Sequence, residues 1–295
     1  MQTSLDECDD TVVSIFVNPA QFAPHEDLAS YPRTLPTDLA ALQMLRSSNS
    51  PERGVSIVFA PSAAEMYPSG LTQVVADQVG AFVEVRGLSH QMEGGSRPSF
   101  FRGVATVCTK LFHMVEPDAA YFGQKDIQQA LILRRMLKDL RFSYPPTPED
   151  LHVCPTARDQ QTGLALSSRN AYLSEKTRCN YAPALHRALQ AGRSTWHSFF
   201  DNAPKRIAET LRVARESLQR EAAHAMEIDG VRLHLDYITL NDPDTLADLE
   251  QQPKEQQTAT RAIISGAVLA SDVLPDGTET RVTRLIDNEL LGFKL

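Results

Sequence analysis

The sequence lacks the signature motifs of the commonest enzyme classes. It contains no GxGxxG fingerprint, no Walker loop, no HExxH zinc motif and no GxSxG nucleophile elbow. Each of these motifs places one chemical group at a fixed point of a fold: a phosphate cradle, a pair of zinc ligands or a nucleophilic serine. Their absence argues against a P-loop enzyme, a common dinucleotide-dependent enzyme, a zinc protease and a serine hydrolase.

Cysteine pairs, basic charge and long apolar runs are missing as well. The four cysteines are Cys8, Cys108, Cys154 and Cys179. They are widely separated and form no CxxC pair, and the histidines lack metal-ligand spacing, so neither a disulfide framework nor a zinc site is predicted. The formal net charge of −8 gives no general attraction to nucleic acid or anionic lipid.

No apolar run reaches the roughly 18 to 20 residues of a membrane span. The first ten residues, MQTSLDECDD, are acidic, whereas a targeting peptide would be basic. We therefore expect a cytoplasmic protein with neither membrane nor nucleic acid as a partner.

The first half of the chain has the pattern of a doubly wound α/β domain. Apolar β-branched runs alternate with segments of helical period, which is typical of a mostly parallel sheet with helices on its faces. The expected strands are TVVSIFV (11–17), VSIVFA (55–60), DAAYF (118–122) and DLHVC (150–154), with FVEV (82–85) as a strand or a connection. The expected helices cover 37–47, 104–115 and 127–140.

The second half follows a different pattern. Two long helices are expected at about 174–191 and 204–223, and three alternating segments, 235–240, 261–270 and 281–287, predict an antiparallel sheet. QQPKEQQTAT (251–260) reads as a mobile insertion and DVLPDGTET (272–280) as a long hairpin loop. With 295 residues to distribute, we predict two domains, 1–170 and 171–295.

Three polar stretches of the first half could bind a ligand or serve only as loops. VNPAQF (17–22) places Gln21 just beyond a strand, where open α/β sheets bind ligands, although Asn-Pro could simply end the strand in a turn. YPRT (31–34) precedes a helix. GGSRPSFFRG (94–103) could be a mobile cationic loop that closes over phosphates, or a solvated surface loop.

Two further stretches have the same two interpretations. In YFGQKDIQQ (121–129), Asp126 and Gln129 are spaced like a capping box. In GLALSSRNAYL (163–173), the two serines could cap a helix, whereas Arg169 could clamp a phosphate in bidentate fashion. Helix starts and strand ends are where an anionic ligand binds, so the cap and the ligand site can coincide.

In order and spacing these stretches resemble successive motifs of the pantothenate synthetase (pantoate–β-alanine ligase) family. The matching blocks are VSIFVNPAQF, DLASYPRT, FAPSAAEMYPSG, MEGGSRPSFFRGV, KLFHMVEPDAAYFGQKDIQQ and GLALSSRNAYLS, with RLIDN (284–288) near the end. The resemblance implies a Rossmann-like nucleotidyltransferase domain, a smaller α+β C-terminal domain and a homodimer. It also implies ATP- and Mg²⁺-dependent condensation of pantoate with β-alanine through pantoyl adenylate, releasing pyrophosphate and AMP.

The resemblance also implies residue roles. Gln21 and Gln129 would hold pantoate, with Gln21 also near β-alanine. The ATP-binding residues would be Gly123, Gln124, Lys125, Asp126, Ala157, Leu166, Ser167, Ser168 and Arg169, with the backbone of Ala157 at the adenine. Lys125 and Arg169 would act in catalysis by cancelling the charge that develops between two anions, a reaction that needs no protein nucleophile. No residue is assigned to the metal.

The sequence departs from the family pattern in three places. Gln124 stands where many relatives have glutamate, and Phe100 stands where many have histidine. The family's first strand and its histidine-x-glycine-histidine motif are absent before TVVSIFV, so we expect the sheet to lack that strand. Three interpretations stay open: a sequence whose start has been cut, a non-catalytic relative that binds pantoate or ATP without turnover, and another adenylating enzyme on the same scaffold.

Overall fold

The computed structural model describes residues 1–24, 26–199 and 202–295. Within them the chain forms two compact units. Unit 1 comprises Met1–Phe122 and Gln128–Cys154, and unit 2 comprises Gly123–Ile127 and Pro155–Leu295. None of the helices in these ranges is long and apolar enough to cross a membrane.

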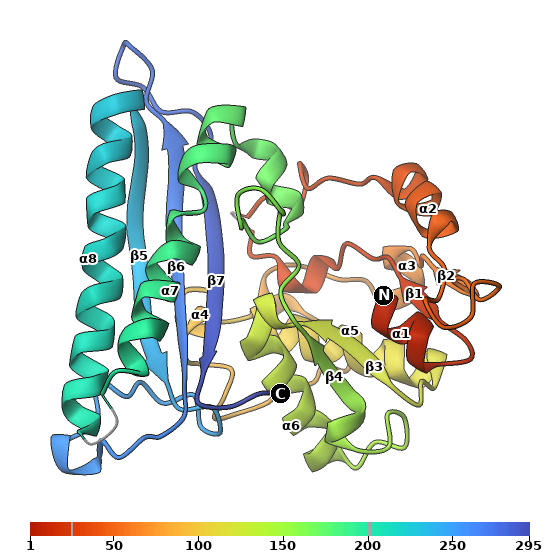
Figure 1. Cartoon of the computed structure of the whole chain (residues 1–295). Coiled ribbons are helices and arrows are strands. Elements are labelled where there is room, and N and C mark those ends of the chain that lie inside the picture. Colours follow the sequence, from red (N-terminus) through yellow and green to blue (C-terminus); the bar gives the residue numbers. More distant parts are fainter. Residues whose placement is uncertain (25, 200–201) are drawn as a thin grey trace. The chain divides into compact units, whose positions relative to one another are not determined.

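Unit 1 contains short strands at the four positions expected from its apolar runs. β1 (Val12–Ser14) pairs in parallel with β2 (Ile57–Phe59), and β3 (Ala120–Gly123) pairs with β4 (Leu151–Cys154) (Figure 1). Over the described residues the two pairs do not join into one sheet. Val12 and Ile57 are 36% and 57% exposed, although their apolar runs predicted buried strands. The expectation that unit 1 lacks the family's first strand stays a prediction.

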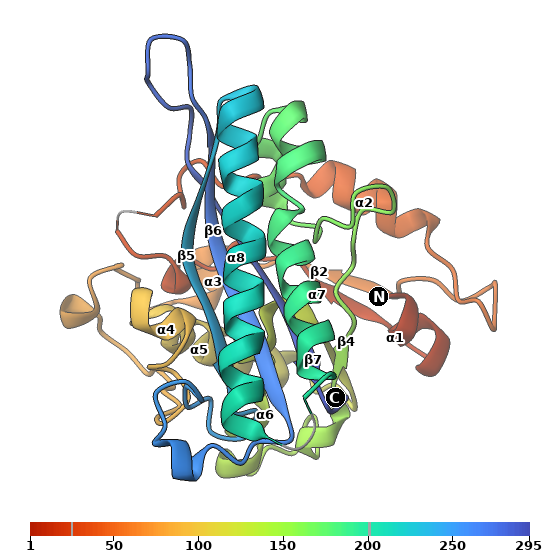
Figure 2. The same cartoon turned by 60° about the vertical axis from the view of Figure 1, so that its left-hand side comes forward.

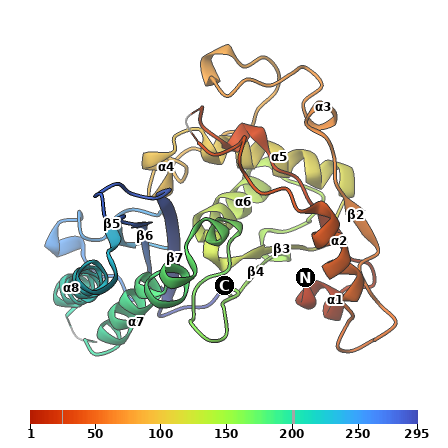
Figure 3. The same ribbon diagram turned by 90° about the horizontal axis from the view of Figure 1, so that it is seen from above.

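Helices make up most of the regular structure of unit 1. They are α1 (Gln2–Glu7), α2 (Leu35–Met44), α3 (Ala63–Met66), α4 (Glu93–Ser96), α5 (Phe100–Val115) and α6 (Ile127–Leu140). α5 and α6 lie side by side (Figure 3), and the Thr109 hydroxyl lies 3.3 Å from the Met136 sulfur. FVEV is a connection rather than a strand: the Val83 N–H donates to Thr106 Oγ1 at 2.9 Å.

Unit 2 is built on an antiparallel sheet, as the alternating segments predicted. β5 (Val231–Asn241), β6 (Ala262–Asp272) and β7 (Thr283–Leu291) follow one another in space, with β6 in the centre. α7 (Ala184–Trp196) and α8 (Ala203–Asp229) lie side by side over one face of this sheet (Figures 2 and 3). Together with the parallel strands of unit 1, this sheet confirms the predicted α/β class with a C-terminal α+β part.

Close packing joins α7 to the sheet. A Cβ atom at Gly192 would lie 2.7 Å from Ile264 Cδ1, and one at Gly266 would lie 2.9 Å from Leu185 Cδ1. Real carbon atoms do not approach so closely, so glycine at both positions lets the helix backbone approach the strand. Trp196, the only tryptophan of the sequence, is 2% exposed in the same core.

The compact units divide the chain at residues other than the predicted 170/171. Leu164 belongs to the hydrophobic core of unit 2, and Arg158 donates to both carboxylate oxygens of Asp287 at 2.6 and 2.9 Å. These contacts hold residues 155–170 in unit 2, and a partner 129 positions away leaves no local pattern in the sequence. The assignment of two domains stays a prediction.

The two expected loops of unit 2 differ in character. The segment 272–280 is a hairpin loop, as predicted, in which the Leu274 N–H donates to Thr278 O at 2.8 Å. The segment 251–260 contains a short 3₁₀ turn, and Gln257 is 8% exposed, with its amide nitrogen donating to Leu249 O and Gln252 O, both at 3.0 Å. Part of the expected insertion is therefore anchored.

Candidate functional site

Asn18 is the buried polar centre of the first candidate stretch in unit 1. It is 2% exposed, and its Nδ2 donates to Gln21 Oε1 at 3.2 Å and to Gly103 O at 3.1 Å. Its Oδ1 accepts from the Tyr67 hydroxyl at 2.7 Å, and burial raises the pKa of Tyr67 to about 12. Since the oxygen end of the Gln21 amide faces Asn18, its NH₂ end is directed away, which suits a donor to a ligand carboxylate.

The arginine-containing stretch of unit 1 is folded and paired. The Arg97 guanidinium donates to both Glu26 carboxylate oxygens, at 2.6 and 2.7 Å, and to Gln21 O at 3.2 Å. It also lies 3.8 Å from the centre of the Phe100 ring. The sequence left open a mobile cationic loop or a solvated surface loop, whereas α4 and the start of α5 occupy this stretch and Glu26, 71 residues away, balances the Arg97 charge.

Gln129 lies near the start of α6 and is half-buried. The residue before it, Gln128, is 3% exposed and donates to Leu88 O at 2.9 Å and to Gln91 O at 2.7 Å. The two neighbours therefore differ in use: Gln128 anchors the chain before α4, and Gln129 keeps part of its side chain accessible.

In unit 2 the predicted nucleotide-binding segment 123–126 follows β3 as a 3₁₀ turn, Gln124–Asp126. Lys125 Nζ lies 3.8 Å from Asp126 Oδ2, and the two side chains are 21% and 45% exposed. Asn288 on β7 donates from Nδ2 to Gln124 O and to Lys125 O, both at 2.9 Å, and Gln124 Nε2 donates to Asn288 Oδ1 at 3.3 Å. One buried amide therefore fixes the backbone of this segment.

The second predicted nucleotide-binding stretch of unit 2 is also held together. The Leu166 N–H donates to Ala157 O at 2.9 Å, which places the two predicted ATP contacts beside each other. The Ser167 hydroxyl accepts from the Arg169 N–H at 3.3 Å and caps the 3₁₀ helix Ser168–Tyr172. The predicted cap is therefore present, and Leu166, 55% exposed, stands at the surface just before it.

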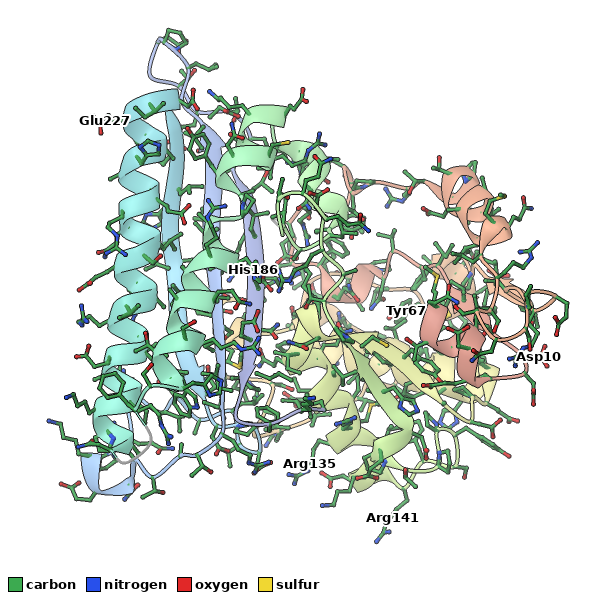
Figure 4. The ribbon with its side chains drawn as sticks, in the orientation of Figure 1. Asp10, Tyr67, Arg135, Arg141, His186 and Glu227 are labelled. Atoms are coloured by element: carbon green, nitrogen blue, oxygen red, sulfur yellow. The ribbon has the colours of Figure 1, made fainter. Side chains whose placement is uncertain are left out.

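A cluster of charged side chains around the buried carboxylates of Asp287 and Glu289 lies between this loop, α7 and β7. Besides its Arg158 pair, Asp287 Oδ2 lies 3.6 Å from His186 Nδ1, which is also 3.7 Å from Glu289 Oε1 (His186 is labelled on α7 in Figure 4). Arg193 donates to Glu289 Oε2 at 2.9 Å. Burial, followed by the Arg158 charge, lowers the pKa of His186 against the opposing effect of the two carboxylates. Burial therefore favours the neutral form of the imidazole.

The structure divides the predicted site residues between the units. Gln21 and Gln129 belong to unit 1. The remaining nine belong to unit 2: Gly123, Gln124, Lys125, Asp126, Ala157, Leu166, Ser167, Ser168 and Arg169. Within unit 2 both segments contact β7, through Asn288 and through Arg158 with Asp287. Sequence reasoning gave no role to these three residues, although the polar Asp-Asn-Glu run inside an apolar strand is a signal that could have revealed Asp287 and Asn288.

Comparison with known proteins identifies the family. The model of the family described as pantoate-β-alanine ligase matches residues 1–290. The chain belongs to the pantoate-β-alanine ligase family. Membership confirms the family and the ligase class predicted from the sequence blocks.

Individual members of the pantoate-β-alanine ligase family match nearly the whole chain. The pantoate–β-alanine ligase of Saccharomyces cerevisiae is 43% identical over 282 residues, which covers 94% of this chain and 82% of that protein. The crystal structure of pantothenate synthetase from Thermus thermophilus matches with a TM-score of 0.69 and 37% identity, covering 95% of this chain and 83% of that one. The Francisella tularensis ligase, crystallised with β-γ ATP and β-alanine, matches with a TM-score of 0.56 and 25% identity over 96% and 80% of the chains.

Proposed function

We propose that this protein condenses pantoate with β-alanine, using ATP, to form pantothenate, AMP and pyrophosphate. The observation that carries the proposal is the family match over residues 1–290. The Francisella tularensis relative, whose complex holds β-γ ATP and β-alanine, supports the choice of substrates.

The reaction proceeds in two steps. A pantoate carboxylate oxygen attacks the α-phosphorus of ATP, the bond to the β-phosphate oxygen breaks, and pyrophosphate leaves. The β-alanine amine then attacks the acyl carbon of pantoyl adenylate, AMP leaves, and the amine loses a proton. No covalent bond to the protein forms in either step. Both steps therefore depend on alignment of the reacting atoms and on cancellation of the negative charge that develops between them.

The site residues take the roles implied by the family resemblance. Gln21 and Gln129 orient pantoate, with Gln21 also near β-alanine. Segment 123–126 and the stretch 157–169 bind ATP, and Lys125 and Arg169 offset the negative charge on the α-phosphate. Mg²⁺ enters with the ATP phosphates as part of the substrate, since this ion keeps several waters and binds mainly through phosphate oxygens and one or two carboxylates. We also propose that the chain forms a homodimer and acts in the cytoplasm.

The test is AMP formation by the purified chain. We expect AMP release that requires ATP, pantoate and β-alanine together, and pyrophosphate release that requires only ATP and pantoate. Saturable binding of pantoate or ATP without AMP release would instead favour a non-catalytic relative. Pyrophosphate release with another carboxylate, but not with pantoate, would favour a different adenylating enzyme. Sedimentation of the same preparation tests the dimer.

A further inference from the structure

Two consecutive residues of β7 hold the two candidate nucleotide segments of unit 2 from opposite faces of the sheet. Successive side chains of a strand point to opposite faces. Asp287 and Glu289 face α7, where Glu289 accepts from Gln190 at 2.6 Å, and Asp287 binds Arg158 of the 155–169 stretch. Asn288, between them, binds the backbone of segment 123–127.

The nitrogen and the oxygen of the Asn288 side-chain amide both have hydrogen-bond partners. Its two N–H groups serve one carbonyl each, at Gln124 and at Lys125, and its oxygen accepts from the Gln124 side chain. Asn288 is 2% exposed, so water has little access to replace these bonds. Aspartate has no N–H to donate and would place a negative charge against two carbonyl oxygens, although its shape is the same.

The two anchors are also bonded to each other. The Asn288 N–H donates to Asp287 Oδ1 at 2.9 Å, and the same oxygen accepts from Arg158 at 2.9 Å. Arg158 in turn donates to Gly163 O at 3.3 Å, inside the stretch that carries the predicted adenine and phosphate contacts. A continuous set of bonds therefore runs from the backbone of Lys125 to the loop ahead of Ser167.

We propose that Asn288, supported by Asp287, is a positioning residue of the nucleotide site. It fixes the backbone at Lys125, and with it the origin of the side chain whose ammonium offsets the α-phosphate charge. This inference rests on the proposed function, because it assigns the two segments to ATP. The inference predicts that replacing Asn288 slows turnover with ATP because Lys125 is displaced. Asn288 itself contacts no substrate.

The test compares Asn288→Asp with a matched control, Asn241→Asp. Asn241 is 3% exposed on β5 of the same sheet, and its amide donates to Leu246 O at 2.9 Å and accepts from the Thr239 hydroxyl at 2.8 Å. Neither contact involves segment 123–127 or the 155–169 stretch. Both variants remove a buried amide donor from unit 2, so both should lower the thermal unfolding temperature.

Only Asn288→Asp should change the kinetics and the local backbone. In Asn288→Asp we expect kcat/KM for ATP to fall on the order of 10- to 100-fold, with a smaller change in the pantoate KM. In Asn241→Asp we expect kcat/KM for ATP to stay within about threefold of the wild-type value. Hydrogen exchange of a peptide covering 120–127 should accelerate in Asn288→Asp alone. Where Asn288→Asp does not fold, Asn288→Ala removes the same donors without adding charge and should show the same pattern at smaller amplitude.

The outcomes separate this inference from the proposed function. A wild-type chain that forms no AMP contradicts the proposed function and removes the assignment to ATP. An active wild-type chain in which Asn288→Asp matches Asn241→Asp in both kinetics and exchange overturns the positioning role alone.

Discussion

The two units hold their candidate site residues in different ways. In unit 1 the strands are short and partly exposed, and buried amides such as Asn18 and Gln128 position the loops by donating to backbone carbonyls. In unit 2 the strands are 9 to 11 residues long, β6 is buried along nearly its whole length, and the segments are attached to β7. Buried amides position the site loops in both units, so the difference lies in the sheet: removing an apolar side chain from a strand should cost more unfolding free energy in unit 2 than in unit 1.

The largest expected effect contrasts one predicted site residue from each unit. Lys125→Ala in unit 2 should slow pyrophosphate release with ATP and pantoate by about 100- to 1000-fold, because it removes a preorganised positive charge, and should leave the pantoate KM nearly unchanged. Gln129→Ala in unit 1 should raise the pantoate KM by about tenfold with a smaller effect on kcat. Steady-state kinetics measure both, and an unchanged rate for Lys125→Ala would remove it from the mechanism.

The second prediction contrasts the two sheets. Ile264→Ala on the central strand of unit 2 should lower the free energy of unfolding by about 2 to 5 kcal/mol, because Ile264 is 0% exposed and a cavity would remain. Ile57→Ala on β2 of unit 1 should cost less than about 1 kcal/mol, since that side chain is 57% exposed. Urea unfolding followed by Trp196 fluorescence reports on unit 2, and far-UV circular dichroism reports on the whole chain. Equal losses of unfolding free energy in the two variants would contradict the expected difference between the two sheets.

The third prediction tests polar positioning in unit 1. Arg97→Ala leaves the Glu26 carboxylate, whose side chain is 15% exposed, without its bidentate partner and should cost about 1 to 2 kcal/mol of unfolding free energy. Arg135→Ala is the matched control, because its pair with Asp139 is about half exposed and should contribute under about 0.5 kcal/mol. A double variant, Arg97→Ala with Glu26→Ala, should regain part of the loss.

The smallest expected effect concerns pH in unit 2. His186 has a lowered pKa in the folded state, so the unfolded chain binds more protons as pH falls through the ordinary histidine range near 6.5. Folding stability should therefore decrease on acidification from neutral pH, and His186→Gln should reduce this dependence. His224→Gln, at an exposed position on α8, serves as the control. A pH dependence that is the same in wild type and His186→Gln would show that other groups dominate.

Sequence reasoning located most elements, because helical period and apolar runs are local properties. The expected helix 127–140 coincides with α6, and the three alternating segments of the second half each fall largely within a strand of unit 2. The strand lengths of unit 1 were overestimated. An apolar run such as TVVSIFV predicts burial, but how far a strand extends depends on the partner beside it, and only Val12–Ser14 pair with β2.

For the candidate site, sequence reasoning supplied residues but not their supports. Gln21, Lys125 and Ser167 lie in motifs that can be read locally or by resemblance. Asn288 binds Gln124 across 164 positions, and no local pattern encodes such a pair. Hydrogen bonds between residues that are far apart in the sequence could be identified only from the three-dimensional structure.

The contact of Gly192 and Gly266 between α7 and the sheet has a mechanical consequence. A side chain at either glycine would meet a terminal methyl group, of Ile264 or of Leu185, at less than 3 Å, so that methyl group or the helix would have to move. The two glycines therefore set the spacing between α7 and the sheet, and with it the distance between His186 on α7 and Asp287 on β7.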